Sequence, residues 1–322
     1  MTQSTKVVLV SDPIYQSHLT GAGHPECPAR YHAIFQSLRS LPLDAASPRD
    51  ALREEILLCH TGEYYQTVME DVNEAFRLGI VDGTFTLSTG DTQICPDSLQ
   101  VALRAAGGVL TGLEAVMERE ARRVFCLVRP PGHHACSNRG MGFCLFNNVA
   151  IGARAAQRAY DVGKILIVDW DVHHGNGTQE IFERDPSVFY FSTHQAPFYP
   201  FTGWEEEKGV GEGKEATLNC PVAAGSESRL DVFRAFQEKL EPAMAAFRPD
   251  LVMISAGFDA HKLDPLGGFN LTDDDFRVLT NLVAAIANQY AEGRIISVLE
   301  GGYDLTALAS AAYAHVRALG NA

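Results

Sequence analysis

Two aspartates and a histidine alternate directly after a short apolar run. Asp169, Asp171 and His173 occupy the segment Asp-Trp-Asp-Val-His, and alternate side chains of an extended segment point to the same side. Asp171 and His173 therefore offer an oxygen and a nitrogen to one point, and Asp259, after another apolar run, can complete the set. Two carboxylates and one imidazole leave a position open on Zn²⁺, as catalysis requires. The alternative is that these acids only cap helices.

A pair of adjacent histidines, His133 and His134, follows the stiff turn Pro-Pro-Gly. Near a metal-bound water they can serve as general base and electrostatic partner, provided that each ring is oriented through its other nitrogen. Asp169 and Asn176 are the expected orienting groups, and an aspartate favours a charged imidazolium more than a neutral asparagine does. Tyr303, after two glycines, can donate its hydroxyl to a developing oxyanion.

Each of these groups follows an apolar run of the kind that forms a buried parallel strand. The predicted strands are Val7–Val10, Val124–Val128, Ile165–Val168, Val188–Phe191, Leu251–Ile254 and Ile295–Leu299. The predicted helices are Ser98–Arg119, interrupted at Gly107–Gly108, then Asn147–Tyr160, Leu230–Phe247 and Thr272–Tyr290. Such alternation predicts a parallel sheet covered by helices on both faces, with ligands at the carboxyl edge of its strands. Without repeats or linkers, residues 1–322 are expected to form a single domain.

One long segment, Gln195–Glu215, is rich in glycine, proline and aromatic residues and has no periodicity. It predicts a long loop, and loops of this length in compact domains are usually functional. The alternative is a surface excursion without a role, as many loops are.

Composition narrows the classes of protein that fit. The 26 Lys and Arg against 40 Asp and Glu give a formal net charge of −14, which disfavours binding to nucleic acid or to an anionic membrane. The apolar run Val7–Val10 is too short for a signal peptide, so a cytoplasmic protein is expected. The seven cysteines are dispersed and contain no Cys-x-x-Cys pair, which disfavours a disulfide framework or a cysteine-rich zinc site.

Taken together, these motifs resemble the zinc-dependent histone deacetylase family of the arginase/deacetylase superfamily, most closely its class II branch and the bacterial-type histone deacetylase-like amidohydrolases. The segments that carry the resemblance are His24–Arg30, Arg129–Ala135, Gly142–Ile151, Ile167–Gln179, Ser255–Gly268 and Leu299–Asp304. The resemblance implies a three-layer α/β/α fold around a central, mainly parallel sheet of about eight strands.

The resemblance also implies roles for single residues. It implies one Zn²⁺ on Asp171, His173 and Asp259, and a tandem general base and acid pair at His133 and His134. Tyr303 would polarise the scissile carbonyl, and Asp169 would lie behind His133. Asn176 matches a position that is Asp in class I members, so His134 should be less readily protonated than in class I.

The family's acyl-lysine tunnel gives a further set of expectations. Phe143 and Tyr199 match its two facing aromatic residues, and Leu266 lies at its mouth, with Gly142 and Gly301 beside the substrate. Asp91 is expected to hold the backbone amides that flank a substrate lysine, or else to cap the helix that follows it. The family's potassium sites match Asp169, Asp171, His173, Ser192 and Thr193 near the zinc, and Phe182, Asp185 and Val188 further out.

The implied activity is hydrolysis of an acyl-lysine amide in a protein or peptide by metal-activated water, with hydroxamates as inhibitors. The first alternative is an acetylpolyamine or other small acylated-amine amidohydrolase. The polyamine-selective eukaryotic relative has Glu after Asp-Pro, where this chain has Leu266. A manganese hydrolase of the arginase type would need more bridging carboxylates, and a non-catalytic binding module should have lost Tyr303 or a metal ligand. A homo-oligomer is compatible with the long aromatic loop.

Overall fold

The computed structural model describes residues 6–321, so Met1–Thr5, part of the N-terminal stretch in which no signal peptide is expected, lie outside the described residues. Its centre is an eight-stranded sheet in which every pairing is parallel. In spatial order the strands are β2 (Asp44–Ala46), β1 (Val7–Ser11), β5 (Arg123–Leu127), β10 (Ile295–Leu299), β9 (Leu251–Ala256), β6 (Ile165–Asp169), β7 (Val188–Gln195) and β8 (Thr217–Val222).

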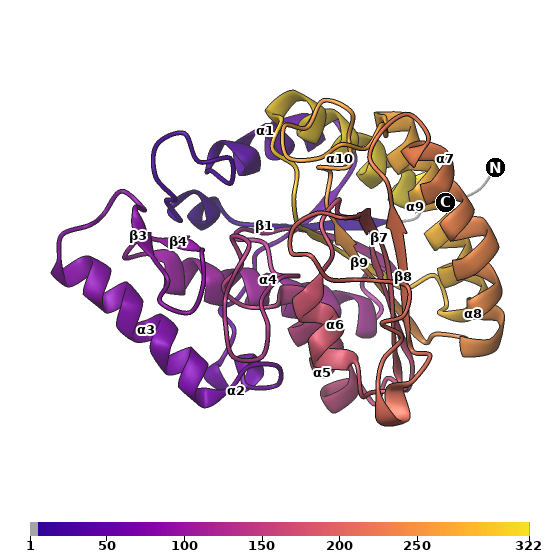
Figure 1. Cartoon of the computed structure of the whole chain (residues 1–322), viewed down its shortest axis with the longest axis horizontal. Helices are drawn as coiled ribbons and strands as arrows, with labels where there is room; N and C mark the ends of the chain where they lie inside the picture. The colour runs from indigo at the N-terminus through magenta and orange to yellow at the C-terminus, as the bar shows by residue number, and fades with distance from the viewer. Residues whose placement is uncertain (1–5, 322) are drawn as a thin grey trace.

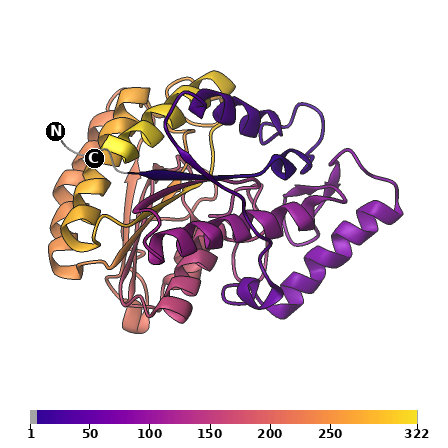
Figure 2. The ribbon, with the colours of Figure 1, turned by 180° about the vertical axis from the view of Figure 1, so that it is seen from behind.

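Helices cover both faces of this sheet, as Figures 1 and 2 show from opposite sides. One layer contains α1 (Ala29–Leu38), α7 (Ser228–Arg234), a π-helical segment (Ala235–Leu240), α8 (Glu241–Phe247), α9 (Asp273–Tyr290) and α10 (Leu305–Asn321). The other contains α2 (Arg53–Ile56), α3 (Gly62–Arg77), α4 (Ser98–Met117), α5 (Asn148–Tyr160) and α6 (Asn176–Phe182). The three-layer α/β/α architecture predicted from the sequence is therefore confirmed.

The central strands are buried throughout, which explains their continuous apolar sequences. All five residues of β5, β6 and β10 are buried, because helices exclude water from both faces of a parallel sheet. All six predicted strands are present, within two residues of their expected starts and four of their expected ends. The two edge strands, β2 and β8, were not predicted.

Helix α4 differs from the prediction, because it continues through Gly107 and Gly108 without interruption. Both glycines permit close packing: a Cβ on Gly107 would lie 1.9 Å from the Arg49 carbonyl oxygen, and one on Gly108 would lie 2.8 Å from the Tyr15 hydroxyl. By length and composition α4 could cross a membrane, but 67% of its most apolar 18-residue stretch is buried inside the protein. The helix therefore serves as a core helix of this fold.

The other predicted helices are present with small differences at their ends. Helix α9 begins after Thr272, whose side chain forms a capping box with Asp275. The predicted helix at Leu230–Phe247 consists of α7, the π-helical segment and α8 in succession. Pro242 lies at the start of α8 and lacks the amide that would bond to the carbonyl four residues earlier, which accounts for the irregular turn before it.

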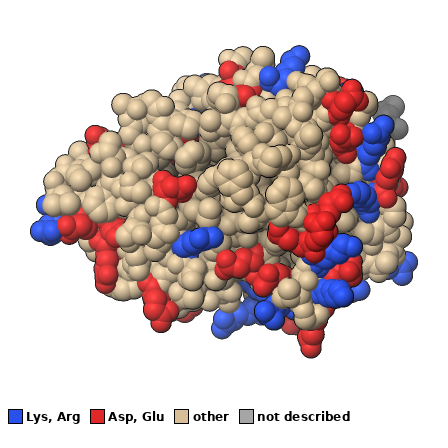
Figure 3. All heavy atoms as spheres, viewed as in Figure 1, with Lys and Arg blue, Asp and Glu red and all other residues tan. Residues whose placement is uncertain are grey.

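Two smaller features lie outside the three layers. A hairpin of β3 (Phe85–Thr86) and β4 (Gln93–Ile94) lies near α3, at the far end of the molecule from α8. Short 3₁₀ helices occupy Pro13–Gln16 and Gly211–Gly213. On the face drawn in Figure 3, charged side chains lie mainly at the periphery and the middle is largely uncharged.

Candidate active site

Strand register brings the predicted metal ligands together. Asp169 at the end of β6 pairs with Ser192 on β7 and with Ser255 on β9, so the segments that follow these strands start side by side. The ligand atoms of Asp171, His173 and Asp259 all lie within 4.8 Å of one another. His173 Nδ1 is 3.1 Å from Asp171 Oδ1 and 3.1 Å from Asp259 Oδ2.

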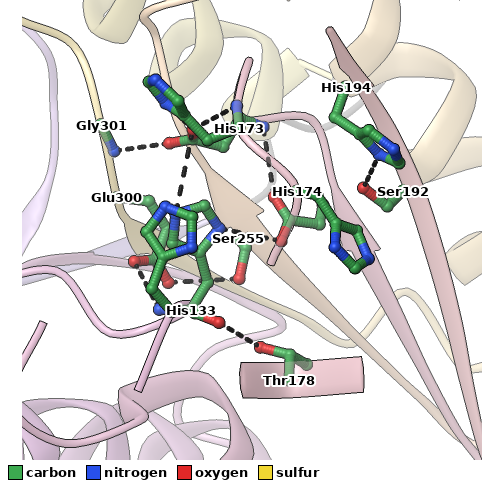
Figure 4. Close-up of polar contacts among 12 residues, drawn as sticks. His133, His173, His174, Thr178, Ser192, His194, Ser255, Glu300 and Gly301 are labelled. Carbon is green, nitrogen blue, oxygen red and sulfur yellow. Dashed lines mark hydrogen bonds and ion pairs between the residues drawn. The ribbon is translucent and has the colours of Figure 1, made fainter. Parts of the chain in front are cut away.

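The two carboxylates of this cluster are held by backbone amides through their other contacts. The Gly301 amide donates to Asp171 Oδ2 (2.8 Å) and the Val172 amide donates to Asp259 Oδ1 (2.9 Å), and Figure 4 shows Gly301 beside the cluster. A Cβ on Gly301 would lie 2.1 Å from Asp259 Oδ2, so only glycine allows this approach. The amides orient one oxygen of each carboxylate toward His173 Nδ1.

The electrostatics of the cluster favour a bound cation. Burial and the neighbouring Asp171 carboxylate raise the pKa of Asp259 to about 7. Burial alone would lower the pKa of His173, but its hydrogen bonds to Asp171 and Asp259 raise it to about 10. Two buried acidic oxygens around one imidazole nitrogen form a donor set that suits a divalent metal with an open coordination position.

The adjacent histidines lie beside this cluster with different partners. Their ring centroids are 4.0 Å apart. His133 Nδ1 is 3.1 Å from Asp169 Oδ2, which also accepts a hydrogen bond from the Tyr190 hydroxyl. His134 Nδ1 donates to Asn176 Oδ1 at 2.8 Å. The structure therefore pairs each ring with the orienting residue expected from the sequence.

These partners give the two imidazoles opposite charge preferences. Burial alone would lower the pKa of His133, but the carboxylates of Asp171 and Asp169 raise it to about 10. Burial, followed by the charges of His133 and His173, lowers the pKa of His134 well below its ordinary value. His134 is thus the neutral ring, and with Nδ1 donating to an amide oxygen, its Nε2 carries a free lone pair.

A buried acid to which the sequence analysis gave no role holds the histidine segment. Glu300 Oε2 accepts hydrogen bonds from the amides of Gly132 (2.7 Å) and His133 (3.2 Å), and Oε1 accepts one from Ser255 Oγ (3.2 Å). Burial raises the pKa of Glu300 to about 7. Figure 4 shows this acid behind the His133 ring, with its carboxylate next to the His133 backbone amide. Glu300 belongs to a motif that the sequence analysis recognised, but its contacts depend on strands that are distant in the chain.

A cavity of about 500 Å³ opens above the cluster. Its lining residues end or follow five strands of the central sheet, and Asp91 joins them from the turn between β3 and β4. Of the predicted substrate residues, Gly142, Phe143, Tyr199, Leu266 and Asp91 line this cavity. The remaining lining residues are His134, His173, Gln195, Phe198, Pro265, Gly267, Gly268 and Tyr303. Gly301 differs from the expectation, because it lies against Asp171 and outside the cavity lining.

The aromatic walls of the cavity are fixed by close packing. Phe143 lies edge-on to Tyr303, with ring centroids 5.8 Å apart, and has a φ of 68°. The preceding Gly142 has a φ of 54°, and a Cβ there would lie 2.4 Å from His134 Cδ2. Opposite them, Tyr199 lies edge-on to His134 and Phe198 stacks on His173. Phe198 is a wall residue that the sequence analysis did not predict.

Asp91 lies at the rim with both of its oxygens engaged. Oδ1 accepts from the Gly142 amide (2.7 Å) and Oδ2 accepts from the Tyr199 hydroxyl (3.2 Å). The following helix α4 starts at Ser98 with Asp97 at its N-cap position. The helix-capping alternative for Asp91 is therefore wrong.

Tyr303 lies where β10 leads into α10, close to the guanidinium of Arg30. The Arg30 Cζ atom lies 5.0 Å from the ring centroid, and Arg30 Nε donates to the Gly302 carbonyl (2.6 Å). Arg30 also pairs with the buried Glu26. Burial raises the pKa of Tyr303 well above its ordinary value, so the phenol keeps its proton and remains a hydrogen-bond donor.

The predicted long loop at Gln195–Glu215 is present: Gln195 is the last residue of β7, and residues 196–215 are irregular apart from one short 3₁₀ turn. The Glu207 carboxylate accepts hydrogen bonds from the amides of Gly203 and Trp204 and from Gln179 on α6. His194 Nε2 donates to the Gly203 carbonyl (2.8 Å). These contacts fix the loop that carries Phe198 and Tyr199.

The residues expected at the potassium sites lie in two groups. In the inner group, Asp169 ends β6 and pairs with Ser192 inside β7, where Thr193 is the next residue, and Asp171 and His173 follow β6. Phe182, Asp185 and Val188 lie in the connection from α6 to β7, where Arg154 pairs with Asp185 and lies over the Phe182 ring.

Comparisons with known proteins agree with this fold. The histone deacetylase domain matches residues 24–319. Histone deacetylase 14, chloroplastic, of Arabidopsis thaliana is 38% identical over 311 residues, which are 92% of this chain and 73% of that protein. Polyamine deacetylase HDAC10 of Danio rerio is 38% identical over 288 residues, 87% of this chain and 40% of that protein. The crystal structure of the HDA15 HD domain superposes with a TM-score of 0.90 at 35% identity, covering 99% of this chain and 90% of that one.

The fold, the match and these relatives define a hydrolytic deacetylase. The chain belongs to the histone deacetylase family. Membership rules against a non-catalytic binding module. An arginase-type manganese pair is also unsupported, because among residues 6–321 Asp171, His173 and Asp259 form the one cluster of three or more ligating side chains.

Proposed function

We propose that the protein removes acetyl or longer acyl groups from lysine side chains of proteins or peptides. The observation that carries this proposal is the lining of the cavity, which is mostly apolar. Apart from Asp91, whose two oxygens are engaged, the lining contains no acid. Apolar walls suit the methylene chain of an acyl-lysine, whose burial is worth about 0.8 kcal/mol per CH₂.

The alternative substrate class is a small acylated amine such as an acetylpolyamine, because one relative is named a polyamine deacetylase. A polyamine would bring a second ammonium group to the rim, where the one acid of the lining, Asp91, already accepts hydrogen bonds from the Gly142 amide and the Tyr199 hydroxyl. Desolvating that ammonium without a free carboxylate beside it costs affinity. The nearby acids are otherwise engaged: Glu205 pairs with Lys239 (2.9 Å) and Glu207 holds its own loop. Their engagement supports the acyl-lysine substrate.

We infer that Asp171, His173 and Asp259 hold one Zn²⁺. When bound there, zinc supplies Lewis-acid chemistry, which polarises the acyl carbonyl and lowers the pKa of water.

The neutral His134 accepts a proton at Nε2 from the attacking water. The Tyr303 hydroxyl donates to the oxyanion that develops on the carbonyl oxygen. His134 then returns its proton to the leaving amine, while the His133 ring, held protonated by Asp169, places its positive charge beside the developing negative charge.

Asn176 gives a test of the role of His134. Replacing it with aspartate places a carboxylate at His134 Nδ1 and raises the pKa of that ring. His134 must be neutral to accept a proton. As the pH is lowered, kcat/KM should therefore begin to fall at a higher pH in this variant than in the wild type. We expect the acidic limb of the pH profile to move upward by about one pH unit or more. An acidic limb that stays in place while zinc content is unchanged would show that another group is the base.

We further infer that K⁺ binds beside the zinc site, on the group around Asp169, Ser192 and Thr193. Buried oxygen atoms at the ends of two adjacent strands support this inner site. The outer group is supported less strongly, because the Arg154 guanidinium already neutralises Asp185. A dependence of activity on K⁺ that the substitution Ser192→Ala weakens would test the inner site.

The substitution Leu266→Glu tests the substrate assignment. A glutamate at the rim supplies the countercharge that a polyamine needs, so kcat/KM for acetylspermidine should rise relative to an acetyl-lysine peptide. We expect the ratio to change by about tenfold, which corresponds to about 1.4 kcal/mol. Both kcat/KM values are measured on the same preparations at low ionic strength, where the charge effect is largest.

Leu263→Glu is the matched control. Leu263 is exposed and lies outside the cavity lining, so the same change of charge there should leave the ratio within about twofold. Equal shifts in the two variants would show a general surface-charge effect and contradict the role given to Leu266.

A further inference from the structure

The side chain of Asp264 joins two parts of the active site. Its Oδ2 atom accepts hydrogen bonds from the backbone amides of Tyr303 (2.6 Å) and Asp304 (3.2 Å). Its Oδ1 atom accepts one from the amide of Leu266 (2.9 Å). Asp264 is 8% exposed and does not line the cavity. One buried carboxylate thus connects the segment that carries Tyr303 to the rim.

The backbone before Tyr303 depends on such an anchor. The two preceding residues are Gly301 and Gly302, and Gly302 has a φ of 121°, in the region that favours glycine. Glycine is the residue with the most conformational freedom to lose. Arg30 Nε donates to the Gly302 carbonyl, and the Tyr303 amide donates to Asp264. The carboxylate therefore sets the position at which the phenol enters the cavity.

The contacts of Asp264 require that both of its side-chain oxygens accept hydrogen bonds. A carboxylate accepts on both sides, whereas the amide of asparagine offers one oxygen and one NH₂ group. In the asparagine variant at least one backbone N–H would face another donor in a buried place, which is unfavourable. The Tyr303 segment or the rim would then move, and a displacement of about 1 Å at a catalytic group can cost about 10²-fold in rate.

We propose that Asp264 is a positioning residue that holds the Tyr303 hydroxyl in its working position and fixes the rim residue Leu266 relative to it. The proposal rests on the function proposed above for Tyr303. Asp264 touches neither the substrate cavity nor the metal cluster, so its effect on turnover should pass through Tyr303.

A double-mutant cycle tests this path. Asp264→Asn is introduced into the wild type and into Tyr303→Phe, and kcat and KM are measured on an acetyl-lysine peptide, normalised to zinc-loaded sites. We expect kcat to fall about tenfold or more in the wild type and less than about twofold in Tyr303→Phe, since a hydroxyl that is absent cannot be misplaced. Zinc content should be unchanged. Asp264→Glu, which keeps the charge but displaces both acceptors, gives the same test if the asparagine variant does not fold.

Asp275→Asn is the matched control. Asp275 is also a fully buried carboxylate with backbone contacts, but it caps α9 and pairs with Arg229. We expect it to lower the melting temperature and leave kcat within about twofold in both backgrounds.

Several results would overturn the proposal. An equal fall in kcat in both backgrounds, an unchanged kcat in Asp264→Asn, or a loss of zinc from that variant would each contradict it. If Tyr303→Phe alone leaves kcat unchanged, the proposed role of the tyrosine fails as well, so the two failures are distinguishable.

Discussion

Replacing Asp259 with alanine is expected to remove both the metal and the hydrolase activity. Asp259 Oδ2 is one of the three atoms that converge in the cluster, and its Oδ1 also holds the Val172 amide. Without it, one carboxylate and one imidazole remain, which is fewer than the three protein ligands typical of catalytic zinc. We expect a loss of activity of at least about 10³-fold, because metal chemistry contributes several kcal/mol to such reactions.

The measurement is zinc stoichiometry together with hydrolysis of an acetyl-lysine peptide. In the wild type, a chelator should abolish activity and added zinc should restore it, whereas added zinc should not restore Asp259→Ala. Hydroxamates should inhibit the wild type, because they offer two oxygens to open coordination positions. Asp275→Ala is the control for loss of a buried carboxylate outside the cluster. Stoichiometric zinc in purified Asp259→Ala would contradict the assigned ligands.

The second large effect is expected from Tyr303→Phe. This change keeps the ring packed against Phe143 and beneath Arg30 but removes the hydroxyl donor. Loss of one oxyanion donor typically lowers kcat by about 10²–10³-fold, and zinc content should not change. Because burial raises the pKa of this phenol well above its ordinary value, the effect should persist across the neutral pH range. A fall smaller than about fivefold would show that the phenol is not used.

The core of the fold could be predicted from sequence because its central strands are buried on both faces. Residues such as Ile165–Val168 form continuous apolar runs that leave little ambiguity. The edge strands carry no such signal. Strand β2 is the mostly exposed Asp-Ala-Ala, and β8 contains Pro221, which an edge strand tolerates because one side needs no hydrogen-bond donor. The predicted interruption of α4 at its two glycines is wrong, because the close contacts that require glycine there come from elements that are distant in sequence.

In the candidate site, too, some residues could be predicted from the sequence and others could not. Asp171 and His173 are two residues apart in the chain, and Asp259 follows a strand of the same sheet, so alternation and the common carboxyl edge of parallel strands predict that they can meet. The contacts of Asp264 and Glu300 depend on side chains that reach across segments joined only by the tertiary fold. No spacing rule in one sequence predicts such contacts.

The most direct test of the proposed function is a comparison of substrates on the wild-type enzyme. Values of kcat/KM are measured side by side for an acetyl-lysine peptide, acetylspermidine and acetylputrescine. The apolar lining around Leu266 and the engaged carboxylate of Asp91 predict the highest value for the peptide. A higher kcat/KM for either acetylpolyamine would contradict the acyl-lysine assignment.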